Sequence, residues 1–314
     1  MMKPDLLYLG ALLVDTVIGD PRCNLHPVVM IGNLINFFEK LLLKENDTAN
    51  NKKKAGALLC LFTVGIVFTV SYSIVLLLEF VGHYSLFFGN ILLLSFTISP
   101  HALRKAAKEI QVLLSIGDIL EARRKVSWIV GRDTHNLNEA EITRATVETV
   151  AENITDGIVA PLFYAFIGGV PLACAYRAVN TLDSMVGYKS ECYLNFGMIS
   201  AKVDDICSFI PARITAMLLI FTTLLLPGYS GERAWKILWR DAAKHPSPNS
   251  GYAEAPVAGA LGIRLGGNNF YFGQPSFREY MGDDDNILNR EHIGKTVILM
   301  YAVTLAFVLI VTFI

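Results

Sequence analysis

The sequence has few charged residues and lacks the usual signatures of a soluble enzyme. Asp, Glu, Lys and Arg make up 18% of the 314 residues, below the roughly 25% that is usual in soluble domains. The chain contains no HExxH or GxSxG motif, and its glycine-rich stretches match neither the Walker A nor the dinucleotide-binding pattern. It therefore lacks the sequence hallmarks of a zinc protease, a serine hydrolase and a P-loop or Rossmann enzyme.

The five cysteines form no CxxC pair and have no metal-ligand spacing. Their odd number and wide scatter favour reduced thiols over a disulfide framework. The formal net charge is −1, so the sequence predicts no nucleic-acid partner. The first apolar run, Leu6–Ile18, is not followed by a small-residue cleavage site and is interpreted as a retained segment.

Apolar residues are abundant instead, at 53% of the chain with a mean hydropathy of +0.44. This composition predicts an all-α, polytopic membrane protein with roughly 4–6 membrane-embedded helices. We expect a single integral membrane domain over residues 1–314. Residues 55–81 form the clearest spanning helix, and further membrane segments are predicted at residues 86–99, 209–226 and 296–314.

Residues 158–179 are apolar but contain two prolines and the pair Gly168–Gly169. A single span would put the polar ends of this segment on opposite faces of the membrane. A re-entrant hairpin that turns at Gly168–Pro171 would keep both ends on one face. Irregular backbone at membrane depth is tolerated where it is buried in protein or lines a cavity, and we favour the hairpin.

Basic residues flank the predicted membrane pair 55–99 on both sides. Lys52–Lys54 precede it, and Arg104, Lys105 and Lys108 follow it. The positive-inside rule places both flanks in the cytoplasm, so residues 100–156 are predicted to be a cytoplasmic helical section. A polar loop section is predicted at about residues 229–295, and the sequence leaves open on which side of the membrane it lies. The predicted localisation is the cell membrane, multi-pass, with the active site facing the cytoplasm.

The stretch Asn138–Tyr164 joins a charged helix to membrane-grade apolar sequence. Glu148, Glu152 and Asp156 recur every four residues, which stacks their side chains on one helix face. Stacked carboxylates repel one another, and hard cations such as Mg²⁺ take oxygen ligands. The alternative interpretation is a solvated helix face, but the apolar residues from Ile158 onward argue against it. We therefore predict a metal or polyphosphate site here.

Further polar motifs follow the central stretch. Asn180, Asp183 and Lys189 lie in the sequence NTLDSMVGYK and suit binding of a phosphate and its metal, although a polar loop with a capping Asp would look the same. Asp204 and Asp205 precede Arg213, which is suited to bidentate phosphate binding or to anchoring a membrane helix.

Two segments near the C-terminus carry small and polar residues. HPSPNSG places His245 and Asn249 around two prolines, which makes a rigid turn. GALGIRLGGNN, with Gly267 and Asn268, offers exposed backbone N–H groups that suit an anion. Tight helix packing in the membrane would explain the glycines equally well.

The ordered motifs together resemble one known family, the CobD/CbiB cobalamin biosynthesis proteins, which are adenosylcobinamide-phosphate synthases. The resemblance spans residues 19–273. It rests on these segments: GDPR-x₃-HPVVMIG, GRDT-x₆-EITRATVETVAENITDGIVAPLFY, AVNTLDSMVGYK, DD-x₅-PAR and HPSPNSGYAEAPVAGALGIRLGGNN.

The resemblance implies a membrane enzyme of vitamin B12 synthesis. It implies ATP-dependent amide formation between adenosylcobyric acid and (R)-1-aminopropan-2-ol phosphate, which gives adenosylcobinamide phosphate. ATP is then a co-substrate and Mg²⁺ the metal. The implied partners are the corrinoid and aminoalcohol phosphate substrates, membrane lipid and other late enzymes of the pathway.

The residue patterns and this chemistry combine into one hypothesis for the site. Catalytic roles fall to Glu152, Asp183, Lys189 and His245. Metal ligands are Glu148, Glu152, Asp156 and Asp183. Groups that bind the nucleotide are Arg144, Asn153, Asn180, Arg213, Asn249, Gly267 and Asn268. The proton of the attacking ammonium would go to one of the carboxylates or to His245.

Two other function classes remain. Buried carboxylates and broken helices also mark transporters, so a corrinoid transporter or a non-catalytic membrane scaffold is the main alternative. A polyprenyl diphosphate transferase would also use acidic stripes, but the repeated DDxxD-type clusters expected of that class are missing from the sequence.

Overall fold

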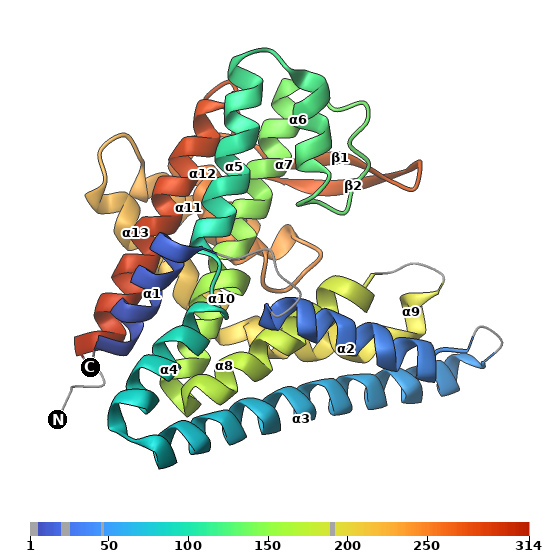
Figure 1. Ribbon diagram of the computed structural model, residues 1–314. Coiled ribbons are helices and arrows are strands. Elements are labelled where there is room, and N and C mark those ends of the chain that lie inside the picture. The colour runs from blue at the N-terminus through green and yellow to red at the C-terminus, as the bar shows by residue number, and fades with distance from the viewer. Residues whose placement is uncertain (1–5, 20–25, 45–46, 189–191, 314) are drawn as a thin grey trace. The chain divides into compact units, whose positions relative to one another are not determined.

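The computed structural model describes residues 6–19, 26–44, 47–188 and 192–313, and the chain folds into two compact units. Unit 1 comprises residues 1–99, 160–208 and 310–314, and unit 2 comprises residues 100–159 and 209–309. Each unit therefore draws on segments that are far apart in the sequence (Figure 1).

The described residues are predominantly helical, as predicted. In chain order the elements are α1 (Leu6–Ile18), α2 (Pro27–Leu42), α3 (Ala49–Val81), α4 (His83–Ser95), α5 (Pro100–Ser115), α6 (Ile119–Val126), α7 (Glu139–Ile154), the π-helical turn η1 (Thr155–Val159), α8 (Ala160–Val186), α9 (Tyr193–Phe196), α10 (Met198–Leu225), α11 (Gly231–Asp241), the 3₁₀ turn η2 (Ala242–Lys244), α12 (Gly251–Leu261), β1 (Leu265–Tyr271), β2 (Gln274–Met281) and α13 (Glu291–Phe313).

Five described helical segments are long and apolar enough to cross a membrane, which confirms the predicted number. They are Ala49–Val81, His83–Ser115, Glu139–Val186, Met198–Leu225 and Glu291–Phe313. The clearest is α3, where only 11% of the most apolar stretch is buried. Large apolar side chains such as Leu61, Leu77 and Phe80 are exposed along it. A helix that exposes apolar residues on most sides is typical of a lipid-facing span.

The chain turns back on itself within α8, at the site predicted for a hairpin. Gly168 and Gly169 leave helical geometry, and Gly169 has φ +73°, a conformation that glycine adopts without a steric penalty. The rings of Tyr164 and Tyr176 stack with centroids 5.0 Å apart. In a straight helix twelve residues would separate them by about 18 Å. The two halves of α8 therefore pack against each other.

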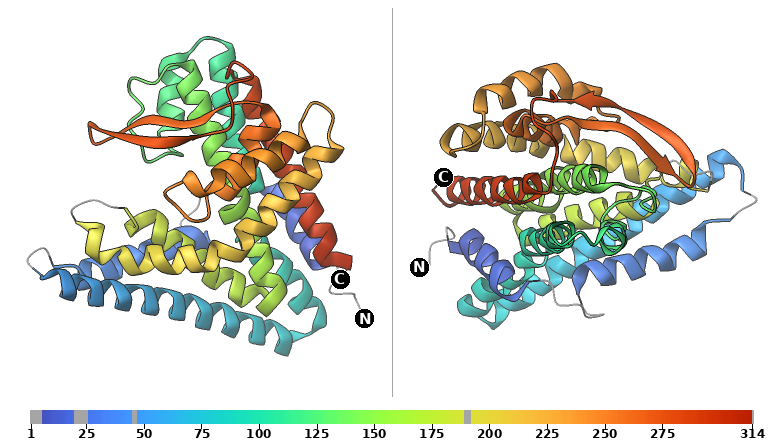
Figure 2. Two further views of the ribbon diagram at one scale, coloured as in Figure 1. Left: turned by 180° about the vertical axis from the view of Figure 1, so that it is seen from behind. Right: turned by 90° about the horizontal axis from the view of Figure 1, so that it is seen from above.

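The core of unit 1 forms where α2, α3, α8 and α9 meet (Figures 1 and 2). Its buried side chains are Ile31, Ile35, Leu59, Cys60, Ala178, Leu182, Val186 and Phe196. On α2 and α8 they recur every four residues, which gives each of these two helices an apolar stripe facing its neighbours.

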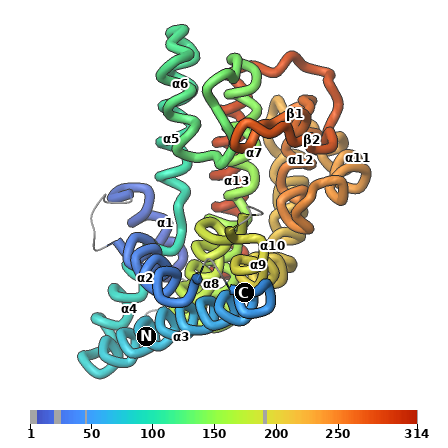
Figure 3. Tube along the Cα trace, turned by 90° about the vertical axis from the view of Figure 1, so that its right-hand side faces the viewer, coloured from blue at the N-terminus to red at the C-terminus, as the bar shows by residue number. Residues whose placement is uncertain are grey.

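Unit 2 combines α5, α6 and α7 with the helix pair α11–α12 and a β-hairpin, which lies beside α7 and α12 (Figure 3). The strands β1 and β2 are antiparallel and pair from Leu265–Met281 to Tyr271–Gln274, with an irregularity between Leu265 and Gly267. The polar loop section predicted at about residues 229–295 thus contains two strands, although LGGNN is rich in glycine and asparagine, which are depleted in strands. Packing against α7 and α12 holds the strands nonetheless.

Candidate functional site

Helix α7 begins with the capping pattern predicted from its sequence. The Asn138 side chain accepts a hydrogen bond from the Glu141 backbone N–H at 2.9 Å, and the Glu141 carboxylate accepts one from the Asn138 N–H at 2.8 Å. This reciprocal cap fixes the start of the helix. Because the start of α7 is fixed, the side of the helix that faces α12 and the hairpin two and three turns later is fixed as well.

Glu148 lies at the centre of a buried charge cluster in unit 2. Its carboxylate accepts hydrogen bonds from the Arg132 guanidinium and from the Gly266 backbone N–H, the latter at 2.9 Å. Arg132 also donates to the Asn269 side chain at 2.7 Å, and the Arg144 guanidinium lies 3.9 Å from Glu148. Both carboxylate oxygens are thus engaged by the protein. Here Glu148 joins α7 to the hairpin rather than standing open to a metal.

Arg144 makes the second link between α7 and the hairpin. Its guanidinium donates to the backbone carbonyls of Gly266 and Asn268, the latter at 2.8 Å. Gly267 has φ +90°, and a Cβ there would lie 2.8 Å from the Arg144 guanidinium. This glycine is therefore needed for the close approach of strand and side chain. Gly267 and Asn268 lie in strand β1, where the Asn268 carbonyl binds Arg144 and Gly267 leaves room for it, instead of forming the predicted loop of N–H groups.

Glu152, one turn after Glu148, contacts the other side of the cluster. Its carboxylate accepts a hydrogen bond from the Ser250 hydroxyl at 2.7 Å. Ser250 ends the HPSPNS turn, in which the Ser247 hydroxyl accepts hydrogen bonds from the Asn249 and Ser250 backbone N–H groups at 3.2 and 3.3 Å. The structure therefore brings this turn to α7, as the combined hypothesis requires, and Glu152 is half-buried there.

Arg213 holds the same turn from α10. Its guanidinium donates to the Asn249 side chain at 2.8 Å and to the Pro248 carbonyl at 3.2 Å. It also lies over the rings of Phe209 and Tyr252, at 3.5 and 3.9 Å from their centroids. The structure joins the predicted binding residues Arg213 and Asn249 to each other, in a contact that supports the turn.

His245 and Glu254 form a buried pair inside the cluster. The His245 Nε2 atom lies 3.5 Å from Glu254 Oε1, and their side chains are 5% and 1% exposed. Burial, and then the charges of Glu148 and Glu152, raise the pKa of Glu254 well above its usual value. Burial also lowers the pKa of His245, although the nearby Glu152 charge opposes this. In both groups burial thus disfavours the charged form.

Other predicted site residues lie elsewhere. Asp156 falls in the π-helical turn η1, which interrupts the 3.6-residue period that would stack it below Glu152. The Asn153 side chain donates back to the Thr149 carbonyl at 2.9 Å. Asn180 and Asp183 belong to unit 1, where Asn180 lies 3.5 Å from Asp204. Lys189 lies outside the described residues.

Among the described residues no group of three or more His, Cys, Asp or Glu side chains is arranged to hold a metal ion. The carboxylates of the stripe that was predicted as a metal site contact different partners instead. Glu148 pairs with arginines and Glu152 with a hydroxyl. The predicted site that combines Asp183 with the acids of α7 draws on residues of both units, and it stays a prediction.

Sequence reasoning missed three members of the cluster: Arg132, Glu254 and Arg278. Arg278 is half-buried on β2, where its guanidinium donates to the Tyr271 hydroxyl at 3.1 Å. Arg278 is far from α7 in sequence, and Arg132 lies in the loop before α7, where the helical period does not apply, so only the fold reveals their contacts. Glu254 left a signal, because an acid within the small, apolar sequence YAEAPVAGA is costly to bury without a purpose.

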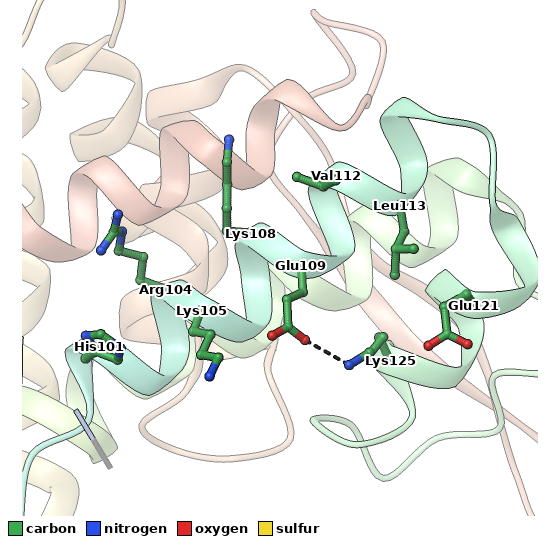
Figure 4. Close-up of a pocket in the computed structure, with 9 residues that line it drawn as sticks. All are labelled: His101, Arg104, Lys105, Lys108, Glu109, Val112, Leu113, Glu121 and Lys125. Atoms are coloured by element: carbon green, nitrogen blue, oxygen red, sulfur yellow. Dashed lines mark hydrogen bonds and ion pairs between the residues drawn. The ribbon is translucent and has the colours of Figure 1, made fainter. Parts of the chain in front are cut away.

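Unit 2 also has a basic groove along α5 and α6, with a volume of about 510 Å³ (Figure 4). Its lining residues are His101, Arg104, Lys105, Lys108, Glu109, Val112, Leu113, Glu121 and Lys125. Lys125 is turned toward Glu109, and their charged atoms are 2.9 Å apart. The remaining lysines and Arg104 give the groove a positive charge.

Comparisons with known proteins agree with the motifs that meet in this cluster. The family model described as CobD/Cbib protein matches residues 8–300. This chain belongs to the CobD/CbiB family. Its relatives include the protein named cobalamin biosynthesis protein CobD of Citrobacter koseri, which is 45% identical over 307 residues, covering 98% of this chain and 96% of the relative.

Two further CobD/CbiB relatives have similar coverage. The CobD protein of Geobacter metallireducens is 45% identical over 99% of this chain and 96% of its own length. The protein named cobalamin biosynthesis protein CbiB of Salmonella typhi is 43% identical over 98% of this chain and 96% of its own length. No solved structure matches the chain. The family model covers α7, the HPSPN turn and the hairpin, so the charge cluster lies within the part that defines the family.

Proposed function

We propose that this chain acts in cobalamin biosynthesis and catalyses ATP-dependent amide formation. The reaction joins adenosylcobyric acid to (R)-1-aminopropan-2-ol phosphate and gives adenosylcobinamide phosphate. Membership of the CobD/CbiB family supports the pathway. The observation that carries the reaction type is the cluster of α7, α12 and the hairpin, in which three arginines and a histidine surround three glutamates.

This cluster fits the needs of carboxylate activation. A carboxylate does not react with an amine at neutral pH until it carries a leaving group. Transfer of a phosphoryl group from ATP to the carboxylate oxygen supplies one, and the amine then displaces phosphate. Both steps develop negative charge on phosphate oxygens, which preorganised cations stabilise. Because burial disfavours the ionised form of Glu254, the guanidinium groups of Arg132, Arg144 and Arg278 outnumber the carboxylates of Glu148 and Glu152.

Glu152 is the residue best suited to hold Mg²⁺ with ATP. Mg²⁺ is usually bound through one or two carboxylates together with substrate phosphates. Glu148 is already engaged by Arg132 and the Gly266 N–H. Glu152 is half-buried, and among the described residues its carboxylate has a single hydroxyl partner. Bound Mg²⁺ would neutralise charge on the transferring phosphoryl group. Arg144 would stay in place beside it through its two carbonyl contacts.

The amine must also lose a proton before it attacks. We assign this proton to Glu152, because Glu148 is engaged by Arg132 and the Gly266 N–H, and the Nδ1 atom of His245 already accepts the Ser247 N–H. The N–H bond of the ammonium breaks, its electron pair forms the amide bond, and the proton passes to the carboxylate. The proton leaves the site after phosphate has been released.

The membrane helices and the basic groove suggest where this reaction takes place. The groove along α5 and α6 follows the apolar helix α4 directly in sequence, and its basic side chains favour the cytoplasmic side. We therefore propose a multi-pass protein of the cell membrane whose active site faces the cytoplasm, where ATP is available. Its partners would be the corrinoid, the aminoalcohol phosphate and neighbouring enzymes of the pathway.

The Glu152→Gln variant tests this assignment in purified protein. We expect turnover to fall by about 10²-fold or more, the lower end of the effect of general acid–base groups, while the protein stays folded. Glu139→Gln, which changes a partly exposed acid that pairs with Arg290 at the start of the same helix, is the matched control and should retain activity. Near-wild-type turnover of Glu152→Gln would remove Glu152 from the mechanism.

A further inference from the structure

Three hydrogen-bond donors face one another around His245. The His245 Nδ1 atom accepts the Ser247 backbone N–H at 3.0 Å, a shorter contact than the 3.4 Å to the Ser247 carbonyl. A neutral imidazole that accepts at Nδ1 carries its proton on Nε2. The Nε2–H group then faces Arg278 Nη1 at 3.4 Å and Glu254 Oε1 at 3.5 Å.

Arg278 brings a guanidinium to this point without a carboxylate partner. Its contacts are the Tyr271 hydroxyl at 3.1 Å and the His245 ring. In the part of the chain that the structure describes, no carboxylate lies within ion-pair distance of Arg278. Because a guanidinium has five N–H donors, Arg278 retains donors for a further acceptor.

Glu254 completes the set from α12. Its side chain is 1% exposed, and neither carboxyl oxygen has a hydrogen-bond partner among the described residues. A buried carboxyl without partners is costly. Burial and the neighbouring Glu148 and Glu152 charges disfavour its ionised form, and a neutral carboxylic acid can itself donate an O–H hydrogen bond.

We propose that Arg278, His245 and Glu254 form a subsite for an anionic oxygen of a substrate phosphate group. The inference rests on the proposed function, because both ATP and the aminoalcohol phosphate carry such a group. A phosphate oxygen supplies the acceptor that the guanidinium, the Nε2–H and the carboxylic O–H lack. Arginine is well suited to this task because its planar fork matches phosphate oxygens.

The charges around the subsite are compatible with an anion. Glu148 on α7 is neutralised by Arg132 and Arg144. Glu152, also on α7, is turned to the Ser250 hydroxyl. The hairpin contributes Arg278 itself, together with Tyr271, and the HPSPN turn contributes His245 itself, backbone groups and the Ser247 hydroxyl. An arriving phosphate would therefore meet an excess of positive charge.

Direct binding measurements on the full chain in detergent test the subsite. The probes are 1-aminopropan-2-ol phosphate, ATP and inorganic phosphate, each titrated into wild type and into R278Q and R278K. We expect R278Q to lose about tenfold to 100-fold in affinity for the ligand that occupies the subsite, the range expected for a charged hydrogen bond. R278K, which keeps the charge but not the fork, should lose less.

The pattern among probes identifies the source of the phosphate. If R278Q loses affinity only for the aminoalcohol phosphate, the subsite binds the amine substrate. If R278Q loses affinity only for ATP, the subsite binds the nucleotide. The control is R264Q, which removes an arginine that pairs with Asp284 on an exposed surface of the same unit. It should bind all probes within about twofold of wild type. Unchanged affinities of folded R278Q and R278K for every probe would overturn the proposal.

The E254Q variant tests the carboxylic acid separately. An amide of the same shape keeps an N–H donor but cannot ionise, so E254Q should bind the phosphate ligand within about threefold of wild type below neutral pH. As the pH rises, wild type should lose affinity relative to E254Q, because an ionised Glu254 repels the phosphate. Equal pH dependence of the two proteins would overturn the role of Glu254.

Binding and turnover also separate this inference from the proposed function. If the chain binds phosphate ligands through Arg278 but forms no amide, the function is wrong and the subsite stands. If wild type forms the product and R278Q binds and turns over equally well, the subsite is wrong and the function stands.

Discussion

The carboxylate of Glu148 accepts a hydrogen bond from the guanidinium of Arg132, although the two side chains are only 2% and 5% exposed. Arg132 precedes α7 and Glu148 lies in its third turn, so the pair fixes the loop that leads into the helix. The same carboxylate accepts the Gly266 N–H of the hairpin. The pair therefore holds together the three segments that carry the proposed active site.

Removing one partner of this pair should destabilise the protein strongly. Arg132→Gln leaves Glu148 buried next to Arg144 alone, and breaking a buried ion pair in this way costs about 3–5 kcal/mol. Thermal unfolding of the purified protein should show a large drop in Tm. Arg124→Gln, which breaks the exposed pair with Glu121, should lower Tm only slightly, because exposed ion pairs contribute little to stability. Equal effects of the two variants would mean that the buried pair does not support the fold.

Gly267→Ala should loosen the hairpin from α7. The new Cβ would lie 2.8 Å from the Arg144 guanidinium, at a residue with φ +90°. Gly273→Ala, at φ +76° with no atom within 4 Å of its Cβ, is the control for backbone strain alone, which costs about 1–3 kcal/mol. We expect the Gly267 variant to lower Tm and turnover further than the control. Identical effects would show that the Arg144 contact contributes nothing.

Asp241 should make the stability of unit 2 depend on acid pH. Burial alone would raise the pKa of this carboxyl, but hydrogen bonds from Arg240, Lys244 and the Gly282 N–H lower it from 3.8 to about 2. A lowered folded-state pKa gives stability that is present above pH 3.8 and is lost as the pH falls through about 2. Asp241→Asn should therefore be less stable than wild type near neutral pH.

Chemical unfolding of the two proteins at several pH values measures this effect. The difference between wild type and Asp241→Asn should shrink as the pH falls from 3.8 towards 2. A difference that stays constant over this range would show that the charge of Asp241 does not stabilise the fold.

The sequence predicted the elements that depend on local chemistry. The cap of α7 follows from Asn138 and Glu141, which bond across one helical turn. The turn in α8 follows from Gly168 and Gly169, since adjacent glycines before a proline disfavour a continuous helix. The membrane helices follow from long apolar runs.

Elements that depend on distant contacts could not be predicted in this way. Strand β1 contains glycine and asparagine, and it forms because Arg144 and Glu148 bind its backbone. The acids of α7 looked equivalent in the sequence, yet Glu148 pairs with Arg132 while Glu152 meets Ser250. Each of these partners is set by tertiary packing, which the helical period alone does not reveal.

The proposed reaction is tested most directly by product formation with the purified full-length chain in detergent. Adenosylcobyric acid, (R)-1-aminopropan-2-ol phosphate, ATP and Mg²⁺ are supplied, and the corrinoid product and ADP are quantified by mass spectrometry. We expect adenosylcobinamide phosphate and ADP in equal amounts, with no product when ATP is omitted. Binding of the corrinoid without any amide product would contradict the proposed reaction and would point instead to a scaffold or a transporter.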